Sequence, residues 1–162
     1  MEIRVRATGA VMLEDEFRAY QKANGGPSWD RTTDEVLEAL GADPVFEGPQ
    51  ATGGTVYQYS MRQGVEQIGG KWHTKYVLGP IFTDNEDATA AEQEVAYKAR
   101  KDAEQAKSVR DDRNKRLTET DWTQVADAPV DKAAWATYRQ ALRDVPSQAG
   151  FPWDIQWPTQ PK

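Results

Sequence analysis

The chain has 162 residues, of which 28% are charged, and its formal net charge is −6 at pH 7. The absence of cysteine excludes a disulfide framework, a thiolate zinc site and a cysteine nucleophile, and the acidic balance argues against nucleic-acid binding, which usually needs a basic surface. No apolar run approaches the roughly 20 residues that cross a bilayer, and residues 1–10 lack the apolar core of a signal peptide, so neither a membrane span nor a secretory leader is expected.

The sequence predicts an α+β chain in three parts. Large aliphatic residues are few, whereas six tryptophans and six tyrosines supply bulk, which favours small modules built around aromatic residues. We expect a small α+β domain over residues 1–83, a long charged linker helix over 84–118, and a C-terminal module over 119–162. The last combines a short helix with an extended tail rich in proline and tryptophan.

Residues 1–83 carry the glycines and β-branched residues typical of a small antiparallel sheet. Alternation over residues 2–5 predicts a short strand, and a second strand is expected at 55–59. The glycine pair at 69–70 predicts a turn into a further strand over 71–77. Alternate side chains of that strand, among them Trp72, share one face.

Two short helices are expected beside this sheet. One spans residues 13–20 and turns Phe17 inward. The other begins at a capping box over residues 32–35, in which the first threonine accepts and the glutamate reaches back. It turns Val36 and Leu40 inward and stops at Gly41.

A second capping box, at residues 83–86, opens the helix expected over 84–118, which contains no glycine or proline. Such a helix is a rod of roughly 50 Å. Residues 84–104 carry a net charge of −4 and residues 105–118 a net charge of +3, which suits the helix dipole. Two interpretations stay open: a solvated spacer, or a coiled-coil seam along the weak apolar stripe of Val95, Ala99, Ala106 and Val109.

The C-terminal module is predicted to contain one helix with an aromatic face. Asp131 is its expected N-cap, and Val130 and Trp135 are spaced as a hydrophobic staple. Trp135, Tyr138 and Leu142 share one face. Proline at 146 ends the helix, and the prolines beyond it predict an extended tail over residues 151–158.

The inventory of reactive side chains is poor. His73 is the only histidine and is expected to be an exposed strand residue, so neither a serine–histidine pair nor a histidine metal site is well supplied. Adjacent acids at residues 14–16 do not face one another on a helix. The glycine doublets match no phosphate-binding fingerprint. We therefore expect no catalysis, no cofactor and no metal.

The informative feature is a set of aromatic and arginine side chains near the C-terminus. These residue types are enriched at binding hot spots, and the same set could also form the core of a small module. The candidate partner-binding residues are Trp122, Trp135, Tyr138, Arg139, Arg143, Phe151, Trp153 and Trp157.

Three segments carry a resemblance to a known family. They are RLTETDWTQVADAPV at 116–130, AWATYRQALRDVP at 134–146, and a final stretch with Gly150-Phe-Pro and Trp157-Pro. Together they resemble the C-terminal module of bacteriophage tail assembly chaperone and tail-fibre assembly proteins over about residues 113–161. Short stretches at Ile3, Phe17 and Trp72 are similar to the N-terminal domain of phage tail proteins that carry this module.

The resemblance implies a non-enzymatic phage tail protein that binds a trimeric tail-fibre polypeptide and assists its folding and assembly. It implies a place in the host cytoplasm during assembly, followed either by release or by retention in the virion tail. Two alternatives stay open. One is a permanent structural subunit of the tail fibre or baseplate without chaperone action, and the other is an adhesin module whose aromatic side chains stack on host-surface sugars.

Overall fold

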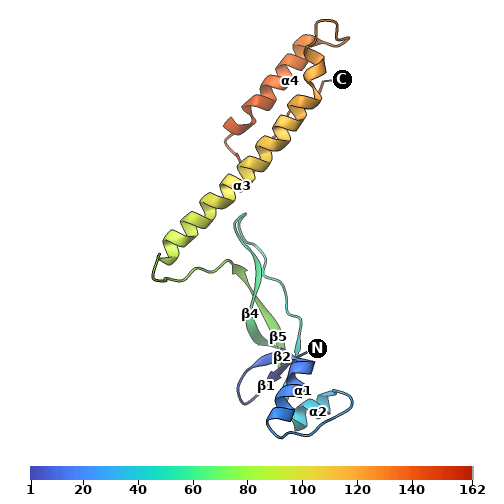
Figure 1. Ribbon diagram of the computed structural model, residues 1–162, viewed down its shortest axis with the longest axis vertical. Helices are drawn as coiled ribbons and strands as arrows, with labels where there is room; N and C mark the ends of the chain where they lie inside the picture. The colour runs from blue at the N-terminus through green and yellow to red at the C-terminus, as the bar shows by residue number, and fades with distance from the viewer. Residues whose placement is uncertain (162) are drawn as a thin grey trace. The chain divides into compact units, whose positions relative to one another are not determined.

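The computed structural model describes residues 1–161 and divides into two compact units. Unit 1 comprises Met1–Ile81, and unit 2 comprises the residues from Phe82 onward. Figure 1 shows the strands in unit 1 and the two longest helices in unit 2. The predicted α+β class is confirmed, whereas the predicted boundaries at residues 83 and 118 stay a prediction.

Unit 1 is built on a five-stranded mixed sheet with the order β2-β1-β3-β5-β4. The strands are β1 (Glu2–Val5), β2 (Val11–Leu13), β3 (Ala42–Phe46), β4 (Tyr59–Ile68) and β5 (Lys71–Gly79). The sheet was expected to be antiparallel throughout, but β3 and β5 pair in parallel, Val45 with Trp72 and Phe46 with His73. Strand β4 lies between β3 and β5 along the chain and pairs antiparallel with β5. The chain therefore reverses direction twice, and β5 runs in the same direction as β3.

Helices α1 (Glu14–Ala23) and α2 (Asp34–Ala39) enclose the core of unit 1 together with the sheet. Phe17 is fully buried, as predicted. The capping box predicted over residues 32–35 is wrong, because the N-cap lies one residue later. It is Thr33, whose hydroxyl accepts a hydrogen bond from the amide of Val36. The buried side chain of α2 is therefore Leu37. Buried with these two side chains are Ile3, Val5 and Ala42.

Of two further predictions for unit 1, the turn at residues 69–70 is confirmed and the strand at 55–59 is wrong. The turn at Gly69 and Gly70 is confirmed, and both glycines have positive φ angles, of 59° and 80°, which side chains other than glycine rarely adopt. The strand expected at 55–59 is wrong, since the amide of Gln58 donates to the carbonyl of Thr55 in a turn and β4 begins only at Tyr59.

Unit 2 contains the long helix α3 (Ala90–Glu119) and the shorter helix α4 (Lys132–Asp144), with 3₁₀ turns at Asp121–Gln124 and Val145–Ser147. The predicted start of α3 is six residues early. Its capping box is formed by Thr89 and Glu92, because the Asn85 side chain instead accepts from the amides of Asp87 and Ala88 and forms a turn before the helix.

Helix α4 matches its prediction closely. The Asp131 carboxylate accepts from the amides of Ala133 and Ala134, and Trp135, Tyr138 and Leu142 form the buried cluster of unit 2. Leu117, Val130 and Trp157 pack against this cluster, so the expected contact of Val130 with the helix is present.

The second half of α3, together with Asp102 just before its midpoint, packs within unit 2. Ala106 and Val109 are buried, whereas Val95 on the first half is 68% exposed. Trp153 Nε1 donates to Asp102 Oδ1 at 2.6 Å, and the Arg116 guanidinium lies 4.3 Å from the ring centre of Trp157. The solvated-spacer interpretation is therefore wrong for this half of the helix.

The tail is less extended than expected, because it folds back through turns at residues 149–154 before it runs without regular structure to residue 161. The amides of Trp153 and Asp154 donate to the carbonyl of Gly150. Within residues 1–161, no helix combines the length and apolar character needed to cross a membrane.

We predict that residues 82–162 fold on their own, because their buried cluster draws only on unit 2. The isolated segment should give a helical circular dichroism spectrum and a cooperative thermal transition. Leu142→Ala should destabilise it by about 2–5 kcal/mol, while Val95→Ala serves as the exposed control with little effect. An unfolded wild-type segment would contradict this prediction.

Candidate partner-binding surface

A buried arginine fixes the junction between α3 and α4. Arg139 lies on α4 and is 7% exposed. Its Nη1 donates to the Leu117 carbonyl at 2.6 Å and to Thr120 Oγ1 at 2.7 Å, and its Nη2 donates to Asp121 Oδ1 at 2.6 Å. A cation at the carboxyl end of a helix is also favoured by the helix dipole. The guanidinium therefore binds both the last turn of α3 and the two residues that follow it.

The hydroxyl groups of two threonines stabilise the turn that follows α3. The Thr120 hydroxyl lies 2.9 Å from the Arg116 carbonyl and 3.0 Å from the Leu117 carbonyl. Thr123 is fully buried, and its hydroxyl donates to the Thr120 carbonyl at 2.7 Å. Polar groups that would be costly to bury alone are thereby satisfied within the turn.

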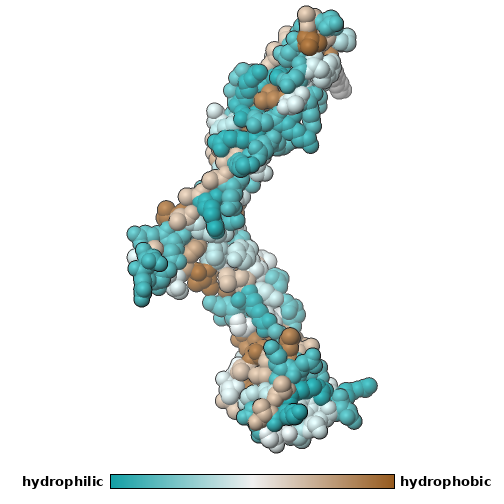
Figure 2. Space-filling model, viewed as in Figure 1, coloured by the Kyte–Doolittle hydropathy of each residue, from teal (hydrophilic) through white to brown (hydrophobic). Residues whose placement is uncertain are grey.

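We call residues 119–131 the Trp122 loop. It presents two large apolar side chains to water, since Trp122 and Val125 are each 52% exposed. The Trp122 ring rests on that of Trp135, with the ring centres 6.1 Å apart. Figure 2 shows a hydrophobic spot among hydrophilic surface at the end of unit 2 that carries this loop. An exposed tryptophan is a candidate contact residue, because tryptophan is enriched among the residues that dominate binding energy.

The charge of the Trp122 loop is one-sided. It contains Glu119, Asp121, Asp127 and Asp131 and no lysine or arginine. The next base, Lys132, donates its amine to the Ala126 carbonyl and so ties the far side of the loop. The exposed apolar pair is therefore presented within an acidic segment.

The structure separates the eight sequence candidates by their burial. Trp135, Tyr138 and Arg139 are buried, whereas Trp122 and Arg143 are exposed. Those of the tail are half-buried, namely Phe151, Trp153 and Trp157. The Arg110 guanidinium lies 5.1 Å from the ring centre of Phe151, so this ring also faces α3. The eight residues thus divide between supporting the fold and facing solvent.

Val125 was not among the residues predicted from the sequence to contact a partner. The sequence does contain a signal for Val125, because it is an isolated β-branched residue in a segment without a strand or helix pattern. Such a residue has no place in a regular hydrophobic face, so either a local core or an exposed contact accounts for it.

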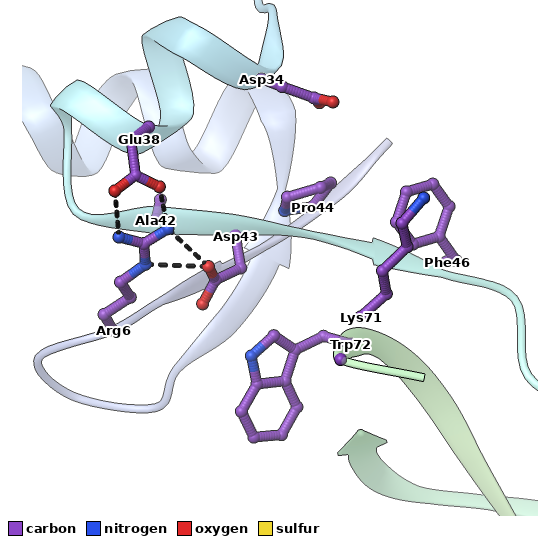
Figure 3. Close-up of a pocket in the computed structure, with 10 residues that line it drawn as sticks. Arg6, Asp34, Glu38, Ala42, Asp43, Pro44, Phe46, Lys71 and Trp72 are labelled. Carbon is purple, nitrogen blue, oxygen red and sulfur yellow. Dashed lines mark hydrogen bonds and ion pairs between the residues drawn. The ribbon is translucent and has the colours of Figure 1, made fainter. Parts of the chain in front are cut away.

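A second concave region lies in unit 1. It is a pocket of about 190 Å³ whose lining includes Glu38, Asp43, Phe46 and Trp72. Figure 3 shows Arg6 pointing toward two carboxylates of this pocket, Glu38 and Asp43, and the hydrogen bonds from Arg6 lower the pKa of Glu38. The volume is below that of typical small-molecule sites, and Arg6, Glu38 and Asp43 already pair with one another, so this pocket is the weaker candidate.

The side chain of His73 also lies in unit 1. It is half-buried rather than exposed, because its ring lies 5.6 Å from that of Phe46. Its Nδ1 is 3.1 Å from the Lys71 carbonyl oxygen. Among the described residues, no three His, Cys, Asp or Glu side chains are grouped so that they could hold a metal ion.

We predict that Trp122 and Trp135, whose rings are in contact, differ sharply in their contribution to stability. Trp135→Ala should cost about 3–5 kcal/mol because the side chain is buried. Trp122→Ser should cost at most about 1 kcal/mol, the scale of one aromatic pair. Thermal or denaturant unfolding of the full chain measures both values, and equal losses would place Trp122 in the core.

Comparison with known proteins identifies part of the chain. Residues 106–162 match the family model of phage tail assembly chaperone proteins. The match covers the packed half of α3, the Trp122 loop, α4 and the tail, and it begins at Ala106, a buried residue of α3. Searches with the chain found no matching curated protein and no matching solved structure. The C-terminal third of the chain is therefore similar to phage tail assembly chaperone proteins, which supports a role in phage tail assembly.

Proposed function

We propose that the chain binds the tail-fibre polypeptide of a phage and assists its folding and assembly in the host cytoplasm. The observation that carries this proposal is the coincidence of two features in one segment. Residues 106–162 match the assembly-chaperone family, and the same residues hold Trp122 and Val125 in water on a well-fixed loop.

The proposed action is binding alone. Trimeric fibres rich in β-structure have unpaired strand edges and uncovered apolar surface before the three chains close, and both promote aggregation. A partner that binds such a folding chain lowers the concentration of the aggregating species by mass action. This mechanism needs no nucleotide, metal or reactive side chain.

The eight candidate residues take different parts in this proposal. Trp122 and Arg143 are exposed and are proposed to contact the fibre directly. The half-buried rings of the tail offer their outer edges to the same partner. Trp135, Tyr138 and Arg139 are buried, and we propose that they act by holding the contacting residues in place.

A second function is favoured by unit 1. Residues 1–81 have a core of their own and lie outside the family match. Unit 1 also exposes Leu13 at 55% and Phe46 and Ile68 at 41% each. A module that only shields a fibre has no evident need of this unit, so the alternative is a subunit that stays in the tail fibre or baseplate. Mass spectrometry of purified particles distinguishes retention from release.

We predict that co-expression with this chain raises the yield of soluble, trimeric fibre from its cognate gene. The matched control is the chain with Leu142→Ala and Val145→Ala, which opens the core of unit 2 because both side chains are fully buried. The control should fail to raise the yield. Equal yields with and without the wild-type chain would contradict the assisting role and leave the structural alternative.

A further inference from the structure

The Trp122 loop combines a fixed backbone, an exposed apolar pair and a one-sided charge. We infer that this loop docks a segment of the fibre polypeptide in which apolar residues are flanked by lysine or arginine. The inference rests on the proposed function and names the chemistry of the partner segment.

The first step is that the loop is fixed at both ends before any partner binds. Arg139 holds its start through the Leu117 carbonyl, Thr120 and Asp121. Asp131 caps α4 at its end, and the Lys132 amine holds the Ala126 carbonyl between them. A loop held in this way loses little conformational entropy on binding, so more of its contact energy appears as affinity.

The second step is that the fold leaves the apolar pair outside. Trp135, whose ring centre lies 6.1 Å from that of Trp122, is 5% exposed, whereas Trp122 itself is 52% exposed. Tryptophan is among the residues that most often dominate binding energy when a partner covers them. Val125 is exposed to the same extent and follows the same turn, so the loop offers two apolar side chains to a partner segment.

The third step is the charge around this contact. Of the four acids in residues 119–131, Asp121 pairs with Arg139 and Asp131 caps α4. Asp127 is exposed and forms no ion pair within residues 1–161. Glu119 is 59% exposed and lies 3.9 Å from Lys115. Complementary charge guides association and disfavours acidic partners, so basic flanking residues fit this site.

The test uses short overlapping peptides that tile the cognate fibre sequence, with binding measured to the full-length chain. Trp122→Ser and Val125→Ser remove the apolar contact, and Asp127→Lys reverses a charge beside it. The matched controls are Val95→Ser, on the exposed half of α3, and Glu86→Lys, an exposed acid outside the loop. Circular dichroism establishes that each variant is folded.

We expect the bound peptides to carry apolar residues flanked by lysine or arginine. Trp122→Ser should weaken their binding by on the order of 30-fold, the scale of a hot-spot residue, and Val125→Ser should weaken it in the same direction. Asp127→Lys should weaken binding at low salt and much less at high salt, because salt screens exposed charges. Both controls should bind as the wild-type chain does.

Three results would overturn the inference. Bound peptides without basic residues, or unchanged binding by the Trp122→Ser and Val125→Ser chains, would show that the docking site or its chemistry is wrong. In those cases the proposed function stands as long as the full-length chain still captures the fibre. Failure of the wild-type chain to bind both the peptides and the fibre overturns the inference and the proposed function together.

Discussion

The arrangement of unit 2 depends on the guanidinium of Arg139. Helix α3 ends with carbonyl groups that have no partner within the helix, and Arg139 supplies a donor to one of them while also binding Thr120 and Asp121. Removing one partner of a buried charged pair typically costs about 3–5 kcal/mol. The Asp121 side chain is 64% exposed, so the loss of stability on removing one partner of the Arg139–Asp121 pair lies toward the lower end of this range. The same contacts set the direction in which the chain leaves α3, and therefore where Trp122 lies.

The long helix has two different environments along its length. Its second half contributes Ala106 and Val109 to the core, and the tail packs on Arg116 and on Asp102, which lies just before the midpoint of the helix. Its first half is solvated and carries i,i+4 pairs such as Glu94 with Lys98. Pairs of this kind add only a few tenths of a kcal/mol each. The family match begins at Ala106, close to where the environment changes, so the matched segment and the packed half of the helix nearly coincide.

Helix caps and hydrophobic periodicity in the sequence predicted much of this fold. They could not predict the pairing of strands that lie far apart along the chain. Asp131 and the aromatic face of α4 could be predicted because caps and periodicity act over a few residues. The parallel contact of β3 with β5 could not, since β3 contains Asp43 and Pro44, which are uncommon in strands. Two capping-box patterns stand close together before α3, and only the turn at Asn85 selects the one at Thr89. For the candidate site, composition indicated Trp122, but local sequence signals do not show whether its side chain and that of Val125 are exposed, which the packing of the whole unit decides.

The central claim of this account is that the Trp122 loop is the surface through which the chain contacts the fibre polypeptide. The most direct measurement is photo-cross-linking in cells that co-express the two proteins, with benzoylphenylalanine replacing Val125 in one chain and Val95 in another. Both positions are exposed and both lie in unit 2. The account predicts a cross-link from position 125 to an apolar, basic segment of the fibre and none from position 95. Cross-links from position 95 alone, or none from position 125 while the proteins still copurify, would contradict it.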